Sequence, residues 1–328
     1  MQDHDVVAIG NALVDVIAQC DDAFLAAHGR TKGSMALVDT PTVEKLYAAM
    51  GPGIEMSGGS AANTMVGVAS LGGKSAFIGK TATDQLGEVF RHDIRAAGVT
   101  FDTPPAGGGE PTGRSLILVT PDGQRTMNTF LGVSPQLGSG EVSADLIRSG
   151  RILYLEGYLF DRPEAQEAYW KASRVAHEAG RRVSLTLSDT FCVERHREAW
   201  RLLVTDQVDV LFANEGEAMA LYEVDTLDEV IRHVQAEVEI TAITCGPRGS
   251  LVVHGDTVTE VPAHPVPKVV DTTGAGDLYA AGFLFGLTNG RSLEACGRLG
   301  SVAASAVLGH TGARPGLSLA QTADSMGL

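Results

Sequence analysis

The chain has 328 residues, of which 44% are hydrophobic and 20% charged, so it can bury a full core and is not disordered as a whole. Its 25 Lys and Arg against 40 Asp and Glu give a formal net charge of −15, which argues against a general nucleic-acid binder and against a polybasic membrane anchor. A local nest of backbone N–H groups can still hold an anion on such an acidic protein, so we expect small-molecule partners, with no nucleic acid and no membrane.

The N-terminal residues MQDHD are acidic and lack the apolar segment of a signal peptide. The longest apolar runs, such as residues 280–287, are too short to span a bilayer. The four cysteines are isolated and form no CxxC pair, which argues against a zinc site. These features predict a soluble, cytoplasmic protein.

Short apolar runs ending at glycine or polar residues predict strands buried on both faces of a sheet. They occupy residues 6–10, 75–78, 152–155, 183–187, 210–212, 242–244 and 251–253. Helical periodicity lies between many of them, at residues 61–71, 86–97, 163–179, 215–221 and 227–235. This alternation predicts one α/β domain over residues 1–328, with a central, mostly parallel sheet and helices on both faces.

Two inserts, at about residues 16–40 and 104–132, interrupt the alternation. The second contains an apolar run at 114–120, a turn at Asp122-Gly123 and a further run at 125–128, which together predict a β-hairpin. We expect both inserts to supply strands of a small sheet attached to the main domain. Such a sheet could act as a lid sub-domain or merely decorate the surface.

Three segments have the composition of a ligand site. The first, residues 57–64 (SGGSAANT), leads into a helix, and its two glycines and Asn63 could surround a polyol, or Ser60 could simply be the helix N-cap. The second begins with Asn214, and Glu217 three residues later lies on the same helical face. This pair could orient the water shell of Mg²⁺ on a nucleotide, or it could be a capping box.

The third segment, residues 271–283, begins DTTGAGD and runs into an apolar helical pattern that ends near Asn289-Gly290. The small residues 274–276 therefore lie at a helix N-terminus, where unpaired N–H groups and the helix dipole favour an anion. Asp277 follows in the first turn, beside any bound phosphate, and could be the general base that takes a proton from a hydroxyl. Ordinary helix capping is the alternative interpretation.

The three segments together, in this order on an α/β chain, resemble the motifs of the PfkB (ribokinase-like) carbohydrate and nucleoside kinases over nearly the whole length. The resemblance implies Asp277 as catalytic base, Gly274, Ala275 and Gly276 as anion hole, and ATP as phosphoryl donor. It implies nucleotide contacts at Asn214, Thr244, Gly246, Thr273, Gly276, Ser305 and Gly312. Asn214 and Glu217 match a pair associated with Mg²⁺ through water, and Asp271 and Thr273 fall where some members bind K⁺.

Within this family, residues 10–15 (GNALVD), 154–158 (YLEGY), 185–191 (LTLSDTF) and 208–215 (VDVLFANE) resemble the adenosine kinase branch. The resemblance implies that Asn11 and Asp15 bind ribose hydroxyls and that Arg125 faces the phosphates. Acceptor contacts are expected from Asn11, Leu13, Asp15, Leu37, Gly58, Gly59, Asn63, Tyr158 and Phe191, although Leu13 and Leu37 could equally be core residues. The sequence departs from the branch at Ala12, Asp189 and Thr190.

We therefore expect ATP- and Mg²⁺-dependent phosphorylation of the 5′-hydroxyl of adenosine, with K⁺ as a further cofactor in some members of the family. One alternative is a kinase of the same fold that acts on ribose, fructose or 2-keto-3-deoxygluconate. A second is a nucleoside-binding protein without catalytic activity. Monomer and homodimer are both compatible with the sequence.

Overall fold

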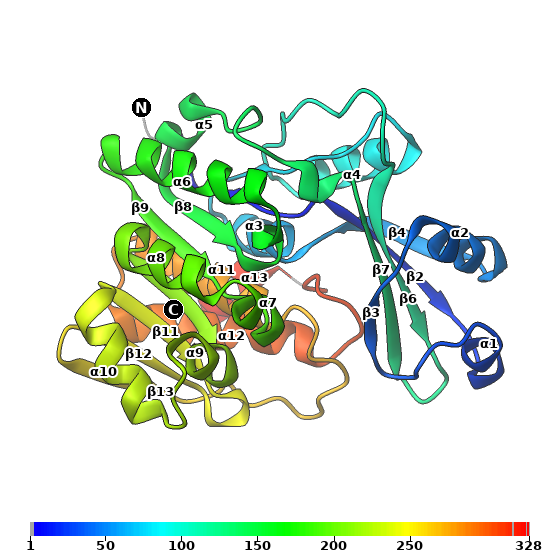
Figure 1. The fold of residues 1–328 in the computed structure, drawn as a ribbon. Coiled ribbons are helices and arrows are strands. Elements are labelled where there is room, and N and C mark those ends of the chain that lie inside the picture. The colour runs from blue at the N-terminus through cyan, green and yellow to red at the C-terminus, as the bar shows by residue number, and fades with distance from the viewer. Residues whose placement is uncertain (1–2, 317, 326, 328) are drawn as a thin grey trace.

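The structure is a computed structural model that describes residues 3–316, 318–325 and 327. Its large sheet has eight strands in the order β13-β12-β11-β10-β9-β8-β1-β5 (Figure 1). Their bounds are β1 His4–Ile9, β5 Ser75–Ile78, β8 Gly150–Glu156, β9 Arg182–Thr186, β10 Val210–Asn214, β11 Ile240–Thr244, β12 Ser250–His254 and β13 Thr257–Val261. All seven predicted strands are present, and only the edge hairpin β12–β13 is antiparallel to its neighbours.

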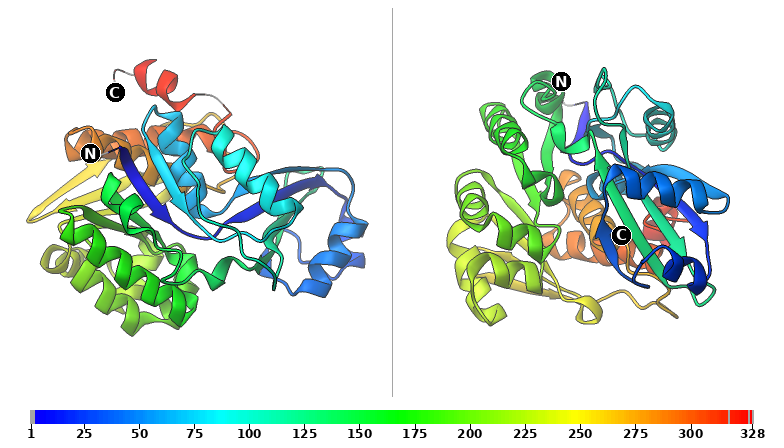
Figure 2. Two further views of the ribbon diagram at one scale, coloured as in Figure 1. Left: turned by 90° about the horizontal axis from the view of Figure 1, so that it is seen from above. Right: turned by 45° about the vertical axis from the view of Figure 1, so that its right-hand side comes forward.

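Helices cover both faces of the large sheet because its central strands are apolar on both sides. In β1, Val6 and Ala8 pack into one core cluster, whereas Val7 and Ile9 pack into another on the opposite face. The first face is covered by α3 (Ser60–Ser70), α4 (Gln85–Ala96), α11 (Ala275–Thr288) and α12 (Leu293–Leu308). The second is covered by α5 (Ala144–Ser149), α6 (Pro163–Glu178), α8 (Arg197–Gln207), α9 (Glu215–Tyr222) and α10 (Leu227–Glu237), and Figure 2 shows the two layers on either side of the sheet.

A second sheet of five strands lies beside the carboxyl ends of the large sheet, in the order β3-β7-β6-β2-β4. Its strands are β2 Leu13–Gln19, β3 Met35–Leu37, β4 Gly53–Gly58, β6 Thr112–Val119 and β7 Arg125–Gly132. The predicted hairpin is β6–β7, paired antiparallel from Val119–Arg125 to Thr112–Gly132. Alternate residues of β7 face opposite sides of the small sheet. Met127 and Thr129 line the space toward the large sheet, whereas Phe130 is buried on the opposite side in a hydrophobic cluster.

The small sheet also contains elements that the sequence patterns did not reveal. The first insert is not built of strands alone, because α1 (Asp22–Ala27) lies within it and α2 (Thr40–Ala49) follows it. Both helices lie on the side of the small sheet away from the large one (Figures 1 and 2). Strand β4 was also missed, and the N-cap of α3 is Gly59, with φ +101°, rather than Ser60.

The chain crosses from one sheet to the other through only three residues, Gly10, Asn11 and Ala12, between β1 and β2. Asn11 therefore lies at the junction of the two sheets and lines the space between them. Among the helices of the described residues, none is long and apolar enough to cross a membrane.

Candidate active site

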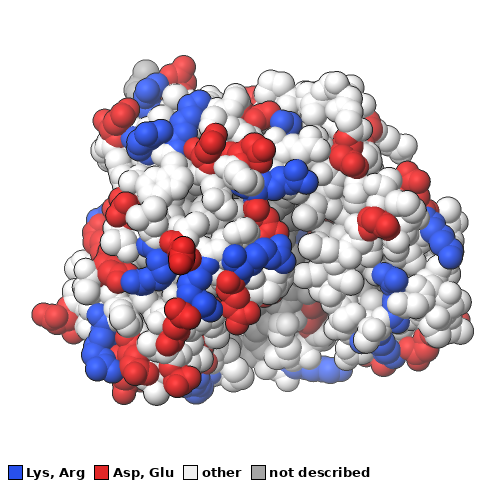
Figure 3. All heavy atoms as spheres, viewed as in Figure 1, with Lys and Arg blue, Asp and Glu red and all other residues white. Residues whose placement is uncertain are grey.

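A cavity of about 520 Å³ lies between the two sheets, and Figure 3 shows the surface hollowed there. One wall is formed where parallel strands end, at Glu156, Thr186, Asn214 and Thr244. Crevices at the carboxyl ends of parallel strands are the usual ligand sites of open α/β sheets. The opposite wall is the inner face of the small sheet.

The N-terminus of α11 forms the floor of the cavity and has the geometry of an anion nest. Gly274 is the N-cap with φ +77°, a left-handed conformation that a side chain disfavours, and a Cβ there would collide with Ala313. Gly276 differs, because a Cβ at this position would meet no atom within 4 Å. The chain at Gly276 therefore faces open space, and Gly274 and Gly276 both line the cavity, where an anion can approach unpaired N–H groups.

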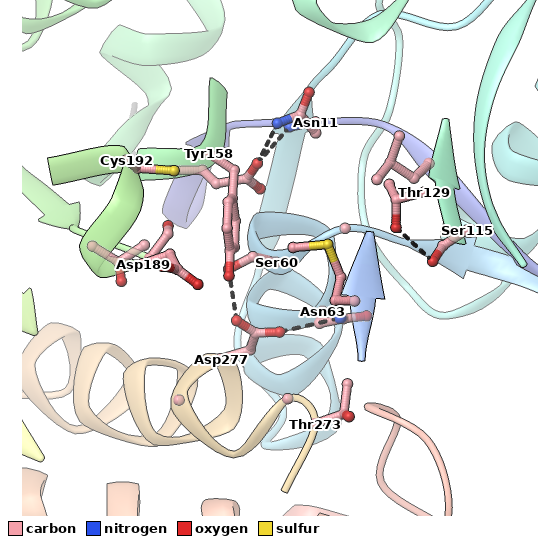
Figure 4. Close-up of a pocket in the computed structure, with 18 of the residues that line it drawn as sticks. Asn11, Ser60, Asn63, Ser115, Thr129, Tyr158, Asp189, Cys192, Thr273 and Asp277 are labelled. Carbon is pink, nitrogen blue, oxygen red and sulfur yellow. Dashed lines mark hydrogen bonds between the residues drawn. The ribbon is translucent and has the colours of Figure 1, made fainter. Parts of the chain in front are cut away.

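Asp277 faces the same space from the first turn of α11 (Figure 4). Its carboxylate accepts hydrogen bonds from Ser60 Oγ at 2.6 Å and from Asn63 Nδ2 at 3.1 Å. Helices α3 and α11 can approach closely because Gly67 packs against Ala281, and this brings the two donors to the carboxylate. Burial raises the pKa of Asp277, and the two hydrogen bonds counteract that shift.

Asn11, at the crossing between the sheets, is held by buried polar groups. Its backbone N–H and its Nδ2 donate to Glu156 Oε1 at 3.0 and 2.8 Å, and Ser134 Oγ donates to its Oδ1 at 2.9 Å. The second oxygen of Glu156 accepts from the Ala61 N–H at 2.7 Å. Burial raises the pKa of Glu156 to about 7 despite these donors. The side-chain Nδ2 and Oδ1 of Asn11 each retain capacity for one more hydrogen bond to a ligand.

Asp15, on β2, lines the cavity and lies against Gly58, where any side chain would collide with its carboxyl group. Burial raises the pKa of Asp15 to about 6.

Asn63 Oδ1 is buried without a hydrogen-bond partner among the described residues. An acceptor of this kind lining a cavity is suited to a hydroxyl donor on a ligand.

Apolar side chains line the cavity on two sides. Tyr158 and Phe191 lie on the large-sheet side, and Met35, Leu37, Met127, Leu13 and Leu131 line it from the small sheet. Leu37 is 52% exposed and Met35 43% exposed, although both belong to the cavity wall. Leu37 is thus an exposed wall residue, whereas Leu13 is both buried and part of the wall.

Asn214 and Glu217 form the capping box of α9 and also line the cavity. The capping interpretation is thus confirmed, and a contact with hydrated Mg²⁺ stays a prediction. Asn214 donates from its N–H and its Nδ2 to the two oxygens of Glu217, at 2.9 and 2.7 Å. The described residues contain no group of three or more Asp, Glu, His or Cys that could hold a metal ion. The pair therefore fits Mg²⁺ only through its water shell and the nucleotide phosphates.

Asp271 lies outside the cavity lining and is occupied by other donors. One oxygen forms an ion pair with Arg125 from β7 and accepts from the Gly312 N–H at 3.0 Å. The other accepts from Thr273 N and Oγ1 at 3.0 and 2.8 Å. Both oxygens of Asp271 therefore already accept from groups of this chain. The assignment of K⁺ to Asp271 and Thr273 stays a prediction. The same ion pair ties the hairpin β6–β7 to the loop before α11.

The structure brings together most of the predicted site residues. Those lining the cavity are Asn11, Leu13, Asp15, Leu37, Gly59, Asn63, Tyr158, Phe191, Asn214, Glu217, Thr244, Thr273, Gly274, Gly276 and Asp277. Those outside its lining are Gly58, Arg125, Gly246, Asp271, Ala275, Ser305 and Gly312. Ser305 turns its hydroxyl to the Val302 carbonyl within α12, and Arg125 faces Asp271 rather than the cavity.

Sequence reasoning missed several residues that shape the site. Glu156 is a charged residue at the end of a buried apolar run, which is a usable signal. Ser60 lies in the predicted ligand segment 57–64, but its contact with Asp277 depends on the packing of two helices that are far apart in sequence. Met35 and Met127 carry no recognisable signal, because only the register of the small sheet turns them inward.

The chain is similar to known kinases over most of its length. The sequence profile of the pfkB family carbohydrate kinases matches residues 54–319. A solved structure described as adenosine kinase from Sinorhizobium meliloti is 51% identical, covers 98% of this chain and 99% of its own, and superposes with a TM-score of 0.91.

Other relatives are described as sugar kinases. A solved structure of a probable sugar kinase from Rhizobium etli is 48% identical, covers 100% of this chain and 99% of its own, and gives a TM-score of 0.92. An uncharacterized sugar kinase of Archaeoglobus fulgidus is 29% identical, over 77% of this chain and 98% of its own length.

Proposed function

Because this chain belongs to the pfkB family of carbohydrate kinases, which transfer a phosphoryl group from ATP to an alcohol, we propose that its acceptor is the 5′-hydroxyl of adenosine. The 51% identity to the Sinorhizobium meliloti adenosine kinase, over almost the whole length of both chains, supports this choice.

The observation that most favours a nucleoside is the apolar and aromatic part of the cavity. Tyr158 and Phe191 face a wall that includes Met35, Leu37 and Met127. A sugar alone offers only small C–H faces to such walls, whereas a purine presents two broad, flat faces. Stacking of a base on an aromatic side chain contributes about 1–3 kcal/mol, which is roughly a 5- to 150-fold difference in affinity.

The polar end of the cavity suits the ribose and the reacting hydroxyl. We assign the ribose hydroxyls to Asn11 and Asp15, with Gly59 and the free Oδ1 of Asn63 as further contacts. Asp277, oriented by Ser60 and Asn63, accepts the proton of the 5′-hydroxyl as this oxygen attacks phosphorus. The N–H groups at the start of α11 stabilise the negative charge on the transferring phosphoryl group.

The remaining predicted residues would serve the nucleotide and the closure of the site. Mg²⁺, when bound, would neutralise the phosphates of ATP, with Asn214 and Glu217 contacting its water shell. Within the single domain of residues 1–328, we propose that the small sheet is the lid. Its ion pair from Arg125 to Asp271 would hold the lid near the anion nest and limit access of water.

A sugar kinase is the second candidate, and one observation favours it. Glu156 and Asp189 place carboxylates in the cavity lining, and polar groups of this kind suit a small polyol. The 48% identity to a probable sugar kinase points the same way.

A panel of acceptors in an ADP-release assay separates the two candidates. We expect the highest kcat/KM for adenosine, with ribose, fructose and 2-keto-3-deoxygluconate at least tenfold lower, as the loss of about 1.4 kcal/mol of base stacking would give. A sugar that reacts faster than adenosine would overturn the assignment. The Asp277→Asn variant, assayed beside the wild type, corrects for contaminating kinases.

A further inference from the structure

Arg314, in the segment after α12 and two residues beyond Gly312, places a guanidinium beside the site, although no motif included this residue. Its Nη2 donates to the backbone oxygen of Ser57 at 2.5 Å and to Ser57 Oγ at 2.8 Å. Its Nε and Nη1 are buried and have no hydrogen-bond partner among the described residues. Burial of unpaired, charged donors costs free energy. We therefore look for negative charges nearby that compensate the guanidinium of Arg314.

The charges of three carboxylates, each from a different element, act on this guanidinium. Asp93 of α4 accepts from the Ser57 N–H at 2.8 Å and from Ser57 Oγ at 2.5 Å, so it shares Ser57 with Arg314. Asp15 of β2 and Asp277 of α11 are the other two acidic groups whose charges act on Arg314. Asp15 packs on Gly58, the residue that follows the carbonyl bound by Arg314, which fixes the guanidinium close to it.

The backbone around Arg314 is attached to the anion nest. The Gly312 N–H donates to Asp271, and Ala313 fills the space beside the Cα of Gly274. The same short segment therefore contacts the nest loop through 312–313 and strand β4 of the small sheet through Arg314.

We propose that Arg314 is a positioning residue for phosphoryl transfer: it supplies the positive charge that balances Asp15 and Asp277, and it joins β4 of the lid to the anion nest. The inference builds on the proposed role of Asp277 as base. Without Arg314, two desolvated carboxylates would face each other across the acceptor site, and each would tend to hold a proton. A protonated Asp277 cannot accept the proton of the hydroxyl.

The groups that face the two carboxylates support this role. Asp277 faces Ser60, Asn63 and Arg314, and within this set only Arg314 carries positive charge. The charges of Arg314, Arg125 and Asp277 act on Asp15. Burial raises the pKa of both carboxyl groups, and Arg314 lowers both. Glu156, Tyr154 and Tyr158 also feel the charge of Asp277 but carry no positive charge themselves.

The test is the pH profile of kcat for the full-length wild type and for Arg314→Gln and Arg314→Lys, using whichever acceptor the wild type phosphorylates. Removal of one positive charge that acts on a buried carboxyl group shifts the pKa of that group by about one to two pH units. In Arg314→Gln we therefore expect the acidic limb of kcat to move upward by about that amount, with recovery at high pH. Arg314→Lys, which keeps the charge, should retain the wild-type limb.

A uniform fall of kcat at every pH in Arg314→Gln, with the limb unmoved, would overturn the proposal and leave only a structural role. An equal shift in Arg314→Lys would also overturn it, because the charge would then not be the cause. Arg298→Gln, which loses an exposed ion pair to Glu294 on α12, is the matched control. If adenosine is not an acceptor but a sugar is, the proposed substrate fails while this test remains valid with that sugar.

Discussion

Asp277 is the residue on which the proposed chemistry depends most. Asp277→Asn keeps the size of the side chain and can still accept from Ser60, but it cannot take the proton of the acceptor hydroxyl. We expect kcat to fall by about 10²- to 10⁴-fold with KM for the acceptor near the wild-type value. Steady-state kinetics measure this, and Asp256→Asn in the exposed β12–β13 turn serves as control. A near-normal kcat would remove Asp277 from the base role.

Leu37 tests the apolar wall at the level of a single side chain. Leu37→Ala removes apolar surface from the wall that we assign to the base, and we expect KM for adenosine to rise about fivefold, equivalent to about 1 kcal/mol. The control is Ile54→Ala, which is 66% exposed on β4 of the same sheet but does not line the cavity. Equal effects of the two variants on KM would argue against a base beside Leu37.

At the scale of one element, the N-terminus of α11 contains two glycines with different physical requirements. Gly274→Ala adds a methyl group at a position whose backbone has a left-handed conformation, and this methyl group would collide with Ala313. Both Tm and kcat should therefore fall. Gly276→Ala places a methyl group in open space, so Tm should change little while kcat falls, because that space is where we place the phosphoryl group.

Thermal melts and kinetics on the two glycine variants, side by side, distinguish stability from catalysis. A Gly276→Ala variant with wild-type kcat would show that no ligand group approaches this peptide. Gly290→Ala offers a control, since it also has positive φ, at +67°, but follows the C-terminus of α11, far from the nest.

Sequence patterns predicted elements well where one local rule decides them. The runs in β1 and β8 are apolar on both faces, and α11 begins at glycines and continues with apolar periodicity, so both kinds of element were evident. Strand β4 was missed because GIEMSG begins and ends with glycine and contains a charged residue. Helices α1 and α2 were missed because their apolar residues, such as Leu25 and Leu46, are sparse.

For the site residues too, local patterns predicted some positions, whereas contacts between distant parts of the chain determine others. Gly274 and Asp277 lie in a segment whose pattern predicted an anion site or ordinary capping, and Asn214 begins one that predicted a Mg²⁺ contact or a capping box. The structure places all three residues in one cavity lining. The contact between Arg314 and Ser57 joins residues 257 positions apart, and no local pattern reports such a contact. The inward side of Met127 depends likewise on strand register, which pairs it with Met35 and Ile117.

For the whole molecule, the acidic groups buried around the cavity predict how stability depends on pH. Burial raises the pKa of Asp15 to about 6, of Glu156 to about 7 and of Glu217 to about 7, from ordinary values of 3.8, 4.5 and 4.5. The folded state therefore holds protons that the unfolded chain has released. The stability linked to these groups is complete below about pH 4 and is lost as the pH rises through 6 and 7.

We expect the free energy of unfolding of the ligand-free protein to decrease between pH 5.5 and 8, by up to about 1.4 kcal/mol per pH unit for each proton involved. Urea denaturation at several pH values measures this. A stability that increases over this interval would contradict the assigned protonation of the three carboxyl groups.

The most direct test of the proposed function is a competition in one vessel. The wild-type enzyme receives MgATP with adenosine, ribose and fructose at equal concentrations, and the phosphorylated products are quantified by mass spectrometry at low conversion. Because the product ratios equal the ratios of kcat/KM, we predict that AMP exceeds each sugar phosphate at least tenfold, the factor given by about 1.4 kcal/mol. A sugar phosphate as the main product would contradict the account.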